Sequence, residues 1–217
     1  MKKTILLIIL MIPLLSYANT YRVGDHDLLL MPTAYTMPQH DSYFTVYEVF
    51  FLNYVYGITN STHLGAFTLF PIVKEAFETI TIGAKQNYLS TDYLESALFT
   101  SYTFKTSTYS LGNVFSLSKN RGNSLHVALM FFVPEKDITG QFVVMGGYRF
   151  DPSDKISLIV EYANMTRLFE EDFNGLISFG VRFRSTNMSW ELGGIRPLED
   201  TGDFIMFPLL KATYHFH

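Results

Sequence analysis

Apolar and polar residues alternate with a period of two along most of this chain, which is the pattern of β-strands. Clusters of Gly, Asn, Asp, Ser and Pro interrupt the alternation and mark turns. We predict about twelve strands, with about ten as the alternative count. Their expected ranges are 26–37, 43–57, 62–70, 78–88, 94–104, 108–117, 124–133, 140–150, 155–164, 174–184, 187–196 and 204–216.

Two of these ranges fit the strand pattern less well than the others. The first contains Pro32, which cannot donate a hydrogen bond to a ladder. The second, 43–57, is apolar on both faces and places Glu48 and Asn53 on opposite ones. A β-bulge between them would turn both side chains to the same side, and we expect that side to be the interior.

The remaining strands combine a bulky apolar face with a face of small polar residues and isolated charges. In 174–184, for example, Phe179 and Phe183 fall on one face while Arg182 and Arg184 fall on the other. A soluble sheet also alternates, but its polar face meets water. In this chain the bulky apolar face suits lipid, and the small polar face suits a narrow lumen. We therefore predict an all-β, antiparallel, up-and-down transmembrane β-barrel, a fold that leaves no backbone group unpaired in lipid.

Composition narrows the class of protein further. The chain has 217 residues, enough for one domain, and a formal net charge of −4, which gives no nucleic-acid footprint. Tyr, which suits a membrane interface, occurs 14 times. There is no Cys, which excludes disulfides, thiolate chemistry and a lipoprotein anchor.

The N-terminus has the three parts of a secretory signal peptide. A basic "MKK" precedes the apolar run "TILLIILMIPLLS", and small residues stand before a cut between Ala18 and Asn19. A retained anchor is the alternative, but the run is short for a spanning helix of about 20 residues. We therefore expect a signal peptide at 1–18 and one barrel domain at 19–217, located in the outer membrane of a Gram-negative cell.

The last predicted strand carries an apolar stripe that ends on two aromatic residues. The opposite face carries Lys211 and His215. A strand that closes a barrel in a membrane needs an apolar stripe that faces lipid. In this strand the stripe consists of Leu210, Ala212, Tyr214 and Phe216.

Three short motifs resemble a known group of proteins. The "PTA" at 32–34, the "GIT" at 57–59 and the "LG" at 64–65 resemble the N-terminus of uncharacterised outer-membrane β-barrel proteins of Gram-negative bacteria. The final "ATYHF" resembles the signal by which the outer-membrane assembly machinery recognises the last strand of a barrel, although here His217 follows Phe216. The resemblance implies a fold and a location but no activity. The partners we expect are outer-membrane lipid and lipopolysaccharide, and the outer-membrane assembly machinery.

Motifs of the common enzyme classes are absent from the chain. Ser124 with His126, or Ser61 with His63, could mimic the Ser–His pair of an outer-membrane hydrolase, because residues two apart share a strand face. No third catalytic group is indicated, and both pairs lie near predicted periplasmic turns. We therefore predict no enzyme activity, no cofactor and no metal site.

Charges of both signs fall on the inward face. Matching the faces of two hairpins places Lys85 opposite Glu95 and Arg182 opposite Glu191. Such a lumen can pair its charges and fill itself, or leave a thin polar path for small solutes. The predicted lumen charges are Glu48, Lys85, Glu95, Arg149, Glu161, Arg182, Arg184, Glu191 and Lys211.

The function predicted from these observations is a structural outer-membrane barrel or a porin-like passive pore for small solutes. One alternative is an outer-membrane hydrolase of lipid or lipopolysaccharide. Another is a soluble periplasmic β-barrel that binds an apolar ligand in its interior. Carboxylates in the predicted outer connections 165–173 and 197–203 could hold cations that bridge lipopolysaccharide, or could be solvated. The sequence does not determine the oligomeric state.

Overall fold

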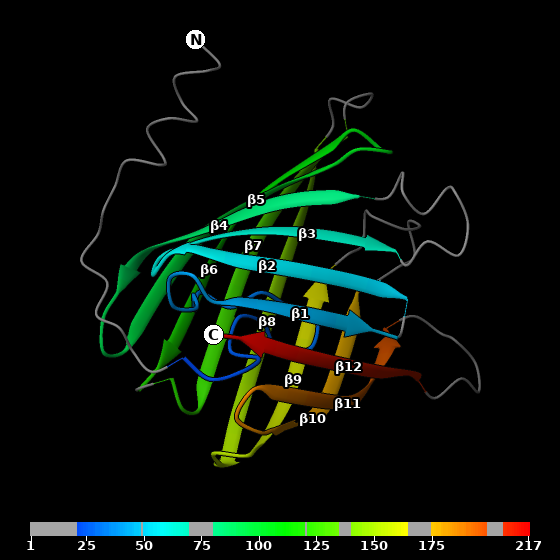
Figure 1. Ribbon diagram of the computed structural model, residues 1–217. Coiled ribbons are helices and arrows are strands. Elements are labelled where there is room, and N and C mark those ends of the chain that lie inside the picture. Colours follow the sequence, from blue (N-terminus) through cyan, green and yellow to red (C-terminus); the bar gives the residue numbers. More distant parts are fainter. Residues whose placement is uncertain are drawn as a thin grey trace.

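The computed structural model describes residues 21–48, 50–69, 80–119, 121–134, 140–164, 175–198 and 206–217. Within them, twelve antiparallel strands form one closed barrel (Figure 1). Each strand pairs with its sequence neighbours, and β1 pairs with β12 to close the ring. The strands are β1 (Ser42–Tyr47), β2 (Phe51–Thr59), β3 (Thr62–Leu69), β4 (Thr81–Ser90), β5 (Leu94–Thr103), β6 (Thr108–Ser118), β7 (Ser124–Pro134), β8 (Gln141–Ser153), β9 (Ile156–Asn164), β10 (Leu176–Arg184), β11 (Met188–Pro197) and β12 (Phe207–Phe216).

This architecture confirms the predicted closed antiparallel barrel. Among the described residues, no helix is long and apolar enough to cross a membrane. The predicted signal peptide and the acidic residues of the two predicted outer connections lie outside the described residues.

The predicted strand count is confirmed, but two of the predicted strands are wrong. The range 26–37 is not a strand, and within it only Asp27 and Pro32 form an isolated bridge. The range 43–57 divides into β1 and β2 at a turn where Glu48 has a φ of 49°. The range is apolar on both faces because it is not one strand: the chain reverses direction at this turn, where we expected a bulge.

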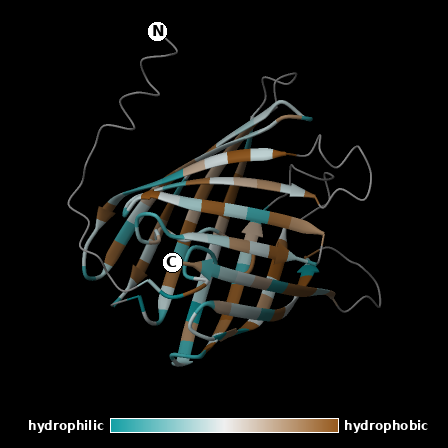
Figure 2. Cartoon of the chain, viewed as in Figure 1, coloured by the Kyte–Doolittle hydropathy of each residue, from teal (hydrophilic) through white to brown (hydrophobic). Residues whose placement is uncertain are grey.

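The barrel wall is apolar outside and polar inside. Figure 2 shows the alternation along the strands. Inward positions are buried and rich in Ser, Thr, His and charged side chains. Large side chains remain exposed on the outer surface, among them Leu111, Phe142, Leu158, Phe179, Trp190 and Leu192.

The register of two hairpins tests the expected charge pairs. Arg182 lies opposite Glu191, which confirms the predicted register of β10 and β11. Lys85 lies opposite Phe99, so its predicted position opposite Glu95 is wrong. A Lys85–Glu95 pair would centre the turn on residue 90, whereas the observed turn lies between Ser90 and Glu95, which are themselves opposite each other.

Residues 21–41, here called the inner segment, run inside the barrel, where they appear in blue in Figure 1. Leu28, Leu29 and Met31 are fully buried and belong to one apolar cluster with wall residues such as Val114 and Ile159. The hydrophobic core therefore lies between the inner segment and the wall, because neither could bury these side chains alone.

The inner segment leaves the lumen at the end of the barrel where β12 finishes, here called the C-terminal end. Gly57 exchanges backbone hydrogen bonds with His40 and Asp41 at this point, with N···O distances of 2.8 and 2.9 Å. A Cβ atom on Gly57 would come within 2.5 Å of the Pro38 carbonyl oxygen, so the close passage requires glycine.

Candidate functional site

The predicted lumen charges lie inside the barrel with one exception. Glu48 occupies the turn between β1 and β2, where its Oε1 accepts a hydrogen bond from the backbone N–H of Leu210 at 2.5 Å. Its assignment to the lumen is therefore wrong, because the chain turns where an inward bulge was expected. Asn53 does line the lumen, as predicted. The charges that point inward are Lys85, Glu95, Arg149, Glu161, Arg182, Arg184, Glu191 and Lys211.

The centre of the site is a cluster of four charges between the inner segment and strands β10 to β12. Arg182 Nε lies 2.9 Å from Glu191 Oε1. Lys211 Nζ lies 3.3 Å from Glu191 Oε2 and 2.6 Å from Asp27 Oδ1. Two cations and two carboxylates thus balance in a buried space where an unpaired charge would be costly.

The wall cations also hold the backbone of the inner segment. Arg182 donates to the carbonyl oxygens of Gly24, Asp27 and Leu28 at 2.6, 2.8 and 2.9 Å. Lys85 Nζ donates to three further carbonyl oxygens of the segment, at 2.8 to 3.2 Å. Except for that of His26, which also accepts the Thr33 N–H at 3.2 Å, these carbonyl groups have no backbone partner within the described residues, so wall side chains satisfy them.

Glu161 binds backbone N–H groups of the same segment. Its carboxylate accepts hydrogen bonds from the backbone of Leu29, Leu30 and Met31, at distances between 2.7 and 3.2 Å. Ser178 Oγ donates a further bond at 2.8 Å. Charge-assisted bonds of this kind are about twice as strong as neutral ones, so Glu161 fixes the fold of the segment at 29–31.

A second charged cluster lies toward the C-terminal end of the barrel. Arg149 Nη1 donates to Asp25 Oδ1 at 2.7 Å, and Arg184 and Arg22 lie 3.7 and 3.9 Å from the same carboxylate. Burial disfavours ionisation of Asp25, but the three guanidinium groups outweigh it and hold the pKa of Asp25 below its ordinary value. The aspartate therefore remains charged and ties the start of the inner segment to the wall.

The third cluster joins Arg121, in the turn before β7, to Glu95. Both guanidinium bonds to the carboxylate measure 2.8 Å, a bidentate geometry. The guanidinium carbon also lies 4.8 Å from the centre of the Tyr35 ring. This turn thereby covers the part of the inner segment that carries Tyr35.

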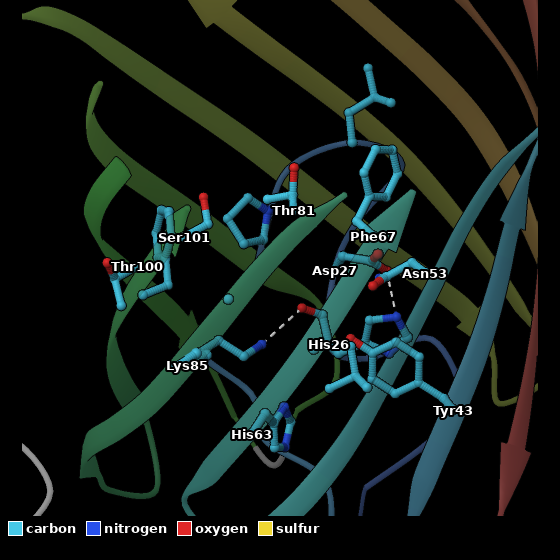
Figure 3. A pocket seen from close by; sticks show the side chains of 17 residues that line it. His26, Asp27, Tyr43, Asn53, His63, Phe67, Thr81, Lys85, Thr100 and Ser101 are labelled. Carbon is cyan, nitrogen blue, oxygen red and sulfur yellow. Dashed lines mark hydrogen bonds and ion pairs between the residues drawn. The ribbon is translucent and has the colours of Figure 1, made fainter. Parts of the chain in front are cut away.

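A cavity of about 260 Å³ remains between the inner segment and the wall formed by β1 to β5. Figure 3 shows Lys85 reaching from the wall toward the carbonyl oxygen of His26. The other walls combine aromatic, hydroxyl and amide groups, so the space suits small solutes with mixed polarity. The labelled lining residues are His26, Asp27, Tyr43, Asn53, His63, Phe67, Thr81, Lys85, Thr100 and Ser101.

One of the two predicted Ser–His pairs meets in space. His126 Nε2 lies 2.8 Å from Ser124 Oγ, and its Nδ1 lies 2.7 Å from Ser116 Oγ. These side chains are 1% exposed or less, and both ring nitrogens face hydroxyl groups instead of a carboxylate that could orient a catalytic base. In the other pair, His63 Nε2 instead accepts a bond from the Met37 N–H at 2.6 Å.

The residues of the predicted assembly signal share the outer face of β12. Leu210, Tyr214 and Phe216 are exposed, and Ala212 is half-buried between them. Lys211 points into the lumen, as the alternation predicted. The stripe is therefore accessible from outside the barrel, and its recognition by the assembly machinery stays a prediction.

Sequence reasoning missed Asp25 and Asp27 of the inner segment, and Arg121 in the turn before β7. It also missed Asp151 in β8, which accepts a hydrogen bond from Arg22 of the segment at 2.8 Å. Apolar residues are frequent in the segment, and their frequency favours a strand in the sequence pattern. Two features argue against a strand: the acidic "GDHD" at 24–27 and the unbroken apolar "LLLM" at 28–31. Neither stretch alternates between apolar and polar residues. Pro32, which has no N–H to donate to a ladder, follows the second stretch directly.

No protein-family model matches the sequence, and no curated protein matches it. Solved structures share its fold. The KdgM porin, solved with a disordered oligogalacturonate, aligns with a TM-score of 0.58 at 7% identity, over 82% of this chain and 98% of that one. Omp33 of Acinetobacter baumannii aligns with a TM-score of 0.52 at 10% identity, over 81% and 96% of the two chains.

A mutant porin of Rh. blastica aligns less well, with a TM-score of 0.43 at 9% identity, and this chain spans 55% of its length. At such identities the shared property is the fold. The chain is a twelve-stranded antiparallel barrel of the kind found in outer-membrane proteins.

Proposed function

We propose that this protein is a passive outer-membrane barrel whose lumen is closed by its own inner segment. The observation that carries the proposal is the polarity of the wall. Large apolar side chains are exposed around the outside, while the charged groups are buried inside, paired with one another and with the inner segment. Lipid suits such an exterior and water does not.

The lengths and ends of the strands support a membrane location. Strands β4 to β12 have 9 to 13 residues, which matches the roughly 9–11 residues that a tilted strand needs to cross a bilayer. Exposed aromatic side chains occur near both ends of the barrel. At the C-terminal end they include Tyr148, Phe183, Trp190 and Tyr214, and at the opposite end Phe104, Tyr109, Phe142 and Tyr162.

Because the inner segment closes the lumen, a solute can cross the barrel only when this segment moves. The inner segment fills the barrel, and charges from several strands hold it. A small polar solute would enter the 260 Å³ cavity and would cross only when the segment moves. KdgM, whose fold this chain shares, is a porin, which supports passive passage.

Neither alternative function fits the described residues as well. A soluble barrel with an apolar ligand inside needs the opposite polarity of its wall. A rim hydrolase needs an accessible nucleophile, whereas Ser124 and His126 are buried beneath the inner segment. The proposal therefore excludes catalysis at this Ser–His pair.

Cell fractionation tests the location. The protein should remain with outer membranes after carbonate and high-salt washes and should be released only by detergent, because its apolar exterior has no aqueous partner. Release by carbonate alone would contradict a membrane-spanning barrel.

Swelling of liposomes in small sugars or amino acids tests the passage. The full chain should give slow swelling, and Glu161→Gln should speed it severalfold, because the inner segment loses its charged anchor at 29–31. Lys155→Gln, in an exposed turn, is the matched control and should equal the wild type. Rates equal to those of protein-free vesicles for all variants would contradict a pore and indicate a structural barrel.

A further inference from the structure

The seam that closes the barrel carries a cluster of three metal-ligating side chains. Asp41 stands just before β1, while His215 and His217 lie at the end of β12. One potential ligand atom from each lies within 4.8 Å of the others. Because 176 positions separate Asp41 from His217, the sequence alone predicted no metal site here.

The distances match the edges of a coordination shell. Asp41 Oδ2 lies 3.2 Å from His215 Nε2 and 3.3 Å from His217 Nδ1. Zinc binds nitrogen and oxygen ligands at about 2.0–2.1 Å, so two ligands of a tetrahedral ion are roughly 3.3 Å apart. Both edges from Asp41 therefore already have the length that a bound ion requires.

His215 gives an independent indication of a missing partner. Its side chain is 2% exposed, yet its Nε2 makes no hydrogen bond within the part of the chain that the structure describes. Asp41 Oδ2 lies 3.2 Å from it and forms an ion pair with it only when the imidazole is protonated. A buried polar atom normally has a partner, and an ion placed between the three side chains would supply one.

The cluster is also accessible. His215 and His217 line a cavity of about 380 Å³ at the C-terminal end of the barrel, together with Tyr21, Arg22 and Arg184. His217 is exposed, with 58% of its side chain accessible. An ion can therefore enter from solvent, and a water molecule from the cavity can complete a four-coordinate shell.

We propose that Asp41, His215 and His217 form a binding site for a borderline transition-metal dication of the Zn²⁺ class. Two imidazoles and one carboxylate favour such an ion over Mg²⁺ or Ca²⁺, which prefer oxygen ligands. The site joins the start of β1 to the end of β12, where Ser42 lies opposite Phe216. Metal binding stabilises the closed ring, because the ligands come together only when the seam has formed.

Isothermal titration of the untagged full chain in detergent, after EDTA treatment, tests the site with Zn²⁺ as the probe. The wild type should bind one Zn²⁺ per chain, and millimolar Mg²⁺ should not compete. His217→Ala should weaken binding at least tenfold and is suited to the test because the side chain is exposed. His40→Gln, in which an exposed neighbouring histidine bonded to Tyr56 is replaced, should bind as the wild type does.

A second measurement separates this site from adventitious binding to surface histidines. Saturating Zn²⁺ should raise the thermal unfolding temperature of the wild type and of His40→Gln, but not of His217→Ala or Asp41→Asn. Equal Zn²⁺ affinity in the wild type and His217→Ala would overturn the proposal. So would stabilisation by Zn²⁺ that persists in Asp41→Asn.

Discussion

The buried pair of Arg182 and Glu191 allows a quantitative test of how the lumen is held together. Replacing Glu191 by Gln keeps the shape of the side chain but removes one of two carboxylates from the central cluster. Arg182 and Lys211 then share Asp27 alone. Removing one partner of a buried pair costs about 3–5 kcal/mol, because the other charge stays buried without compensation.

Replacing Arg182 by Met removes more than the ion pair. The carbonyl oxygens of Gly24 and Asp27 also lose their donor, while that of Leu28 keeps the bond from Lys211 Nζ at 2.7 Å. Each unsatisfied carbonyl adds about 1–3 kcal/mol unless water reaches it. We therefore expect Arg182→Met to destabilise the protein more than Glu191→Gln.

The double variant restores the charge balance, because Lys211 still faces Asp27 at 2.6 Å. It should be less destabilised than the sum of the single variants by about 2–3 kcal/mol, the upper end of measured couplings. Urea unfolding in lipid vesicles gives these free energies. Trp190, the only tryptophan, lies on the outer face of β11 beside Glu191 and reports the loss of the barrel. Additivity within about 0.5 kcal/mol would refute the buried coupling.

Three further predictions concern other parts of the molecule. The double variant Tyr214→Ala with Phe216→Ala should reduce barrel insertion in cells, measured as heat-modifiable protein in membranes. The control variant Phe179→Ala with Phe183→Ala, on the outer face of β10, should reduce insertion less. Equal losses in the two variants would argue against a terminal assembly signal. Gly24→Ala should lower stability by about 1–2 kcal/mol in thermal unfolding, because Gly24 has a φ of 83° and the new Cβ would lie 3.0 Å from Ser189 Oγ, whereas Gly122→Ala should have a smaller effect. Burial lowers the pKa of His26 to about 4, so the unfolded chain binds the extra proton first and stability should fall as the pH drops from about 6.5 toward 4. His26→Gln should flatten this part of the pH profile, and an unchanged profile would show that His26 does not contribute to it.

The wall of the barrel could be predicted from the sequence because its constraint is local. A strand with lipid on one side and a narrow lumen on the other must alternate, and the chain does so from 62 onward. The Arg182–Glu191 register followed from a short hairpin that contains no bulge. Lys85 and Glu95 do not pair because the turn of their hairpin lies at 91–94, later in the chain than that pairing requires, and the one-residue shift at 87–89 is too small to account for the difference.

The inner segment could not be predicted in this way, because its constraints are long-range. Its backbone groups are satisfied by Arg182, Glu161 and Lys85, which lie on strands distant in sequence. A segment held by side chains needs no periodic pattern of its own. The inward charges were recognised, but they were expected to bind one another, and several of them bind the inner segment.

The N-terminal motifs that resemble those of other outer-membrane barrels lie where the inner segment meets the wall. The "PTA" at 32–34 lies in the inner segment, where Ala34 is fully buried and its N–H donates to Ser116 Oγ at 2.8 Å. Gly57 of the "GIT" lies where the segment leaves the lumen. Both motifs therefore belong to the closure of the lumen.

The most direct test of the closed lumen is the current through single proteins in a planar bilayer, with the inner segment either locked or free. The chain contains no cysteine, so Ala34→Cys with Ser116→Cys introduces one defined pair between the segment and β6. We predict that the oxidised variant carries no current at any voltage that the bilayer withstands, and that reduction restores openings like those of the wild type. An open-channel current that persists in the oxidised variant would contradict closure by the inner segment.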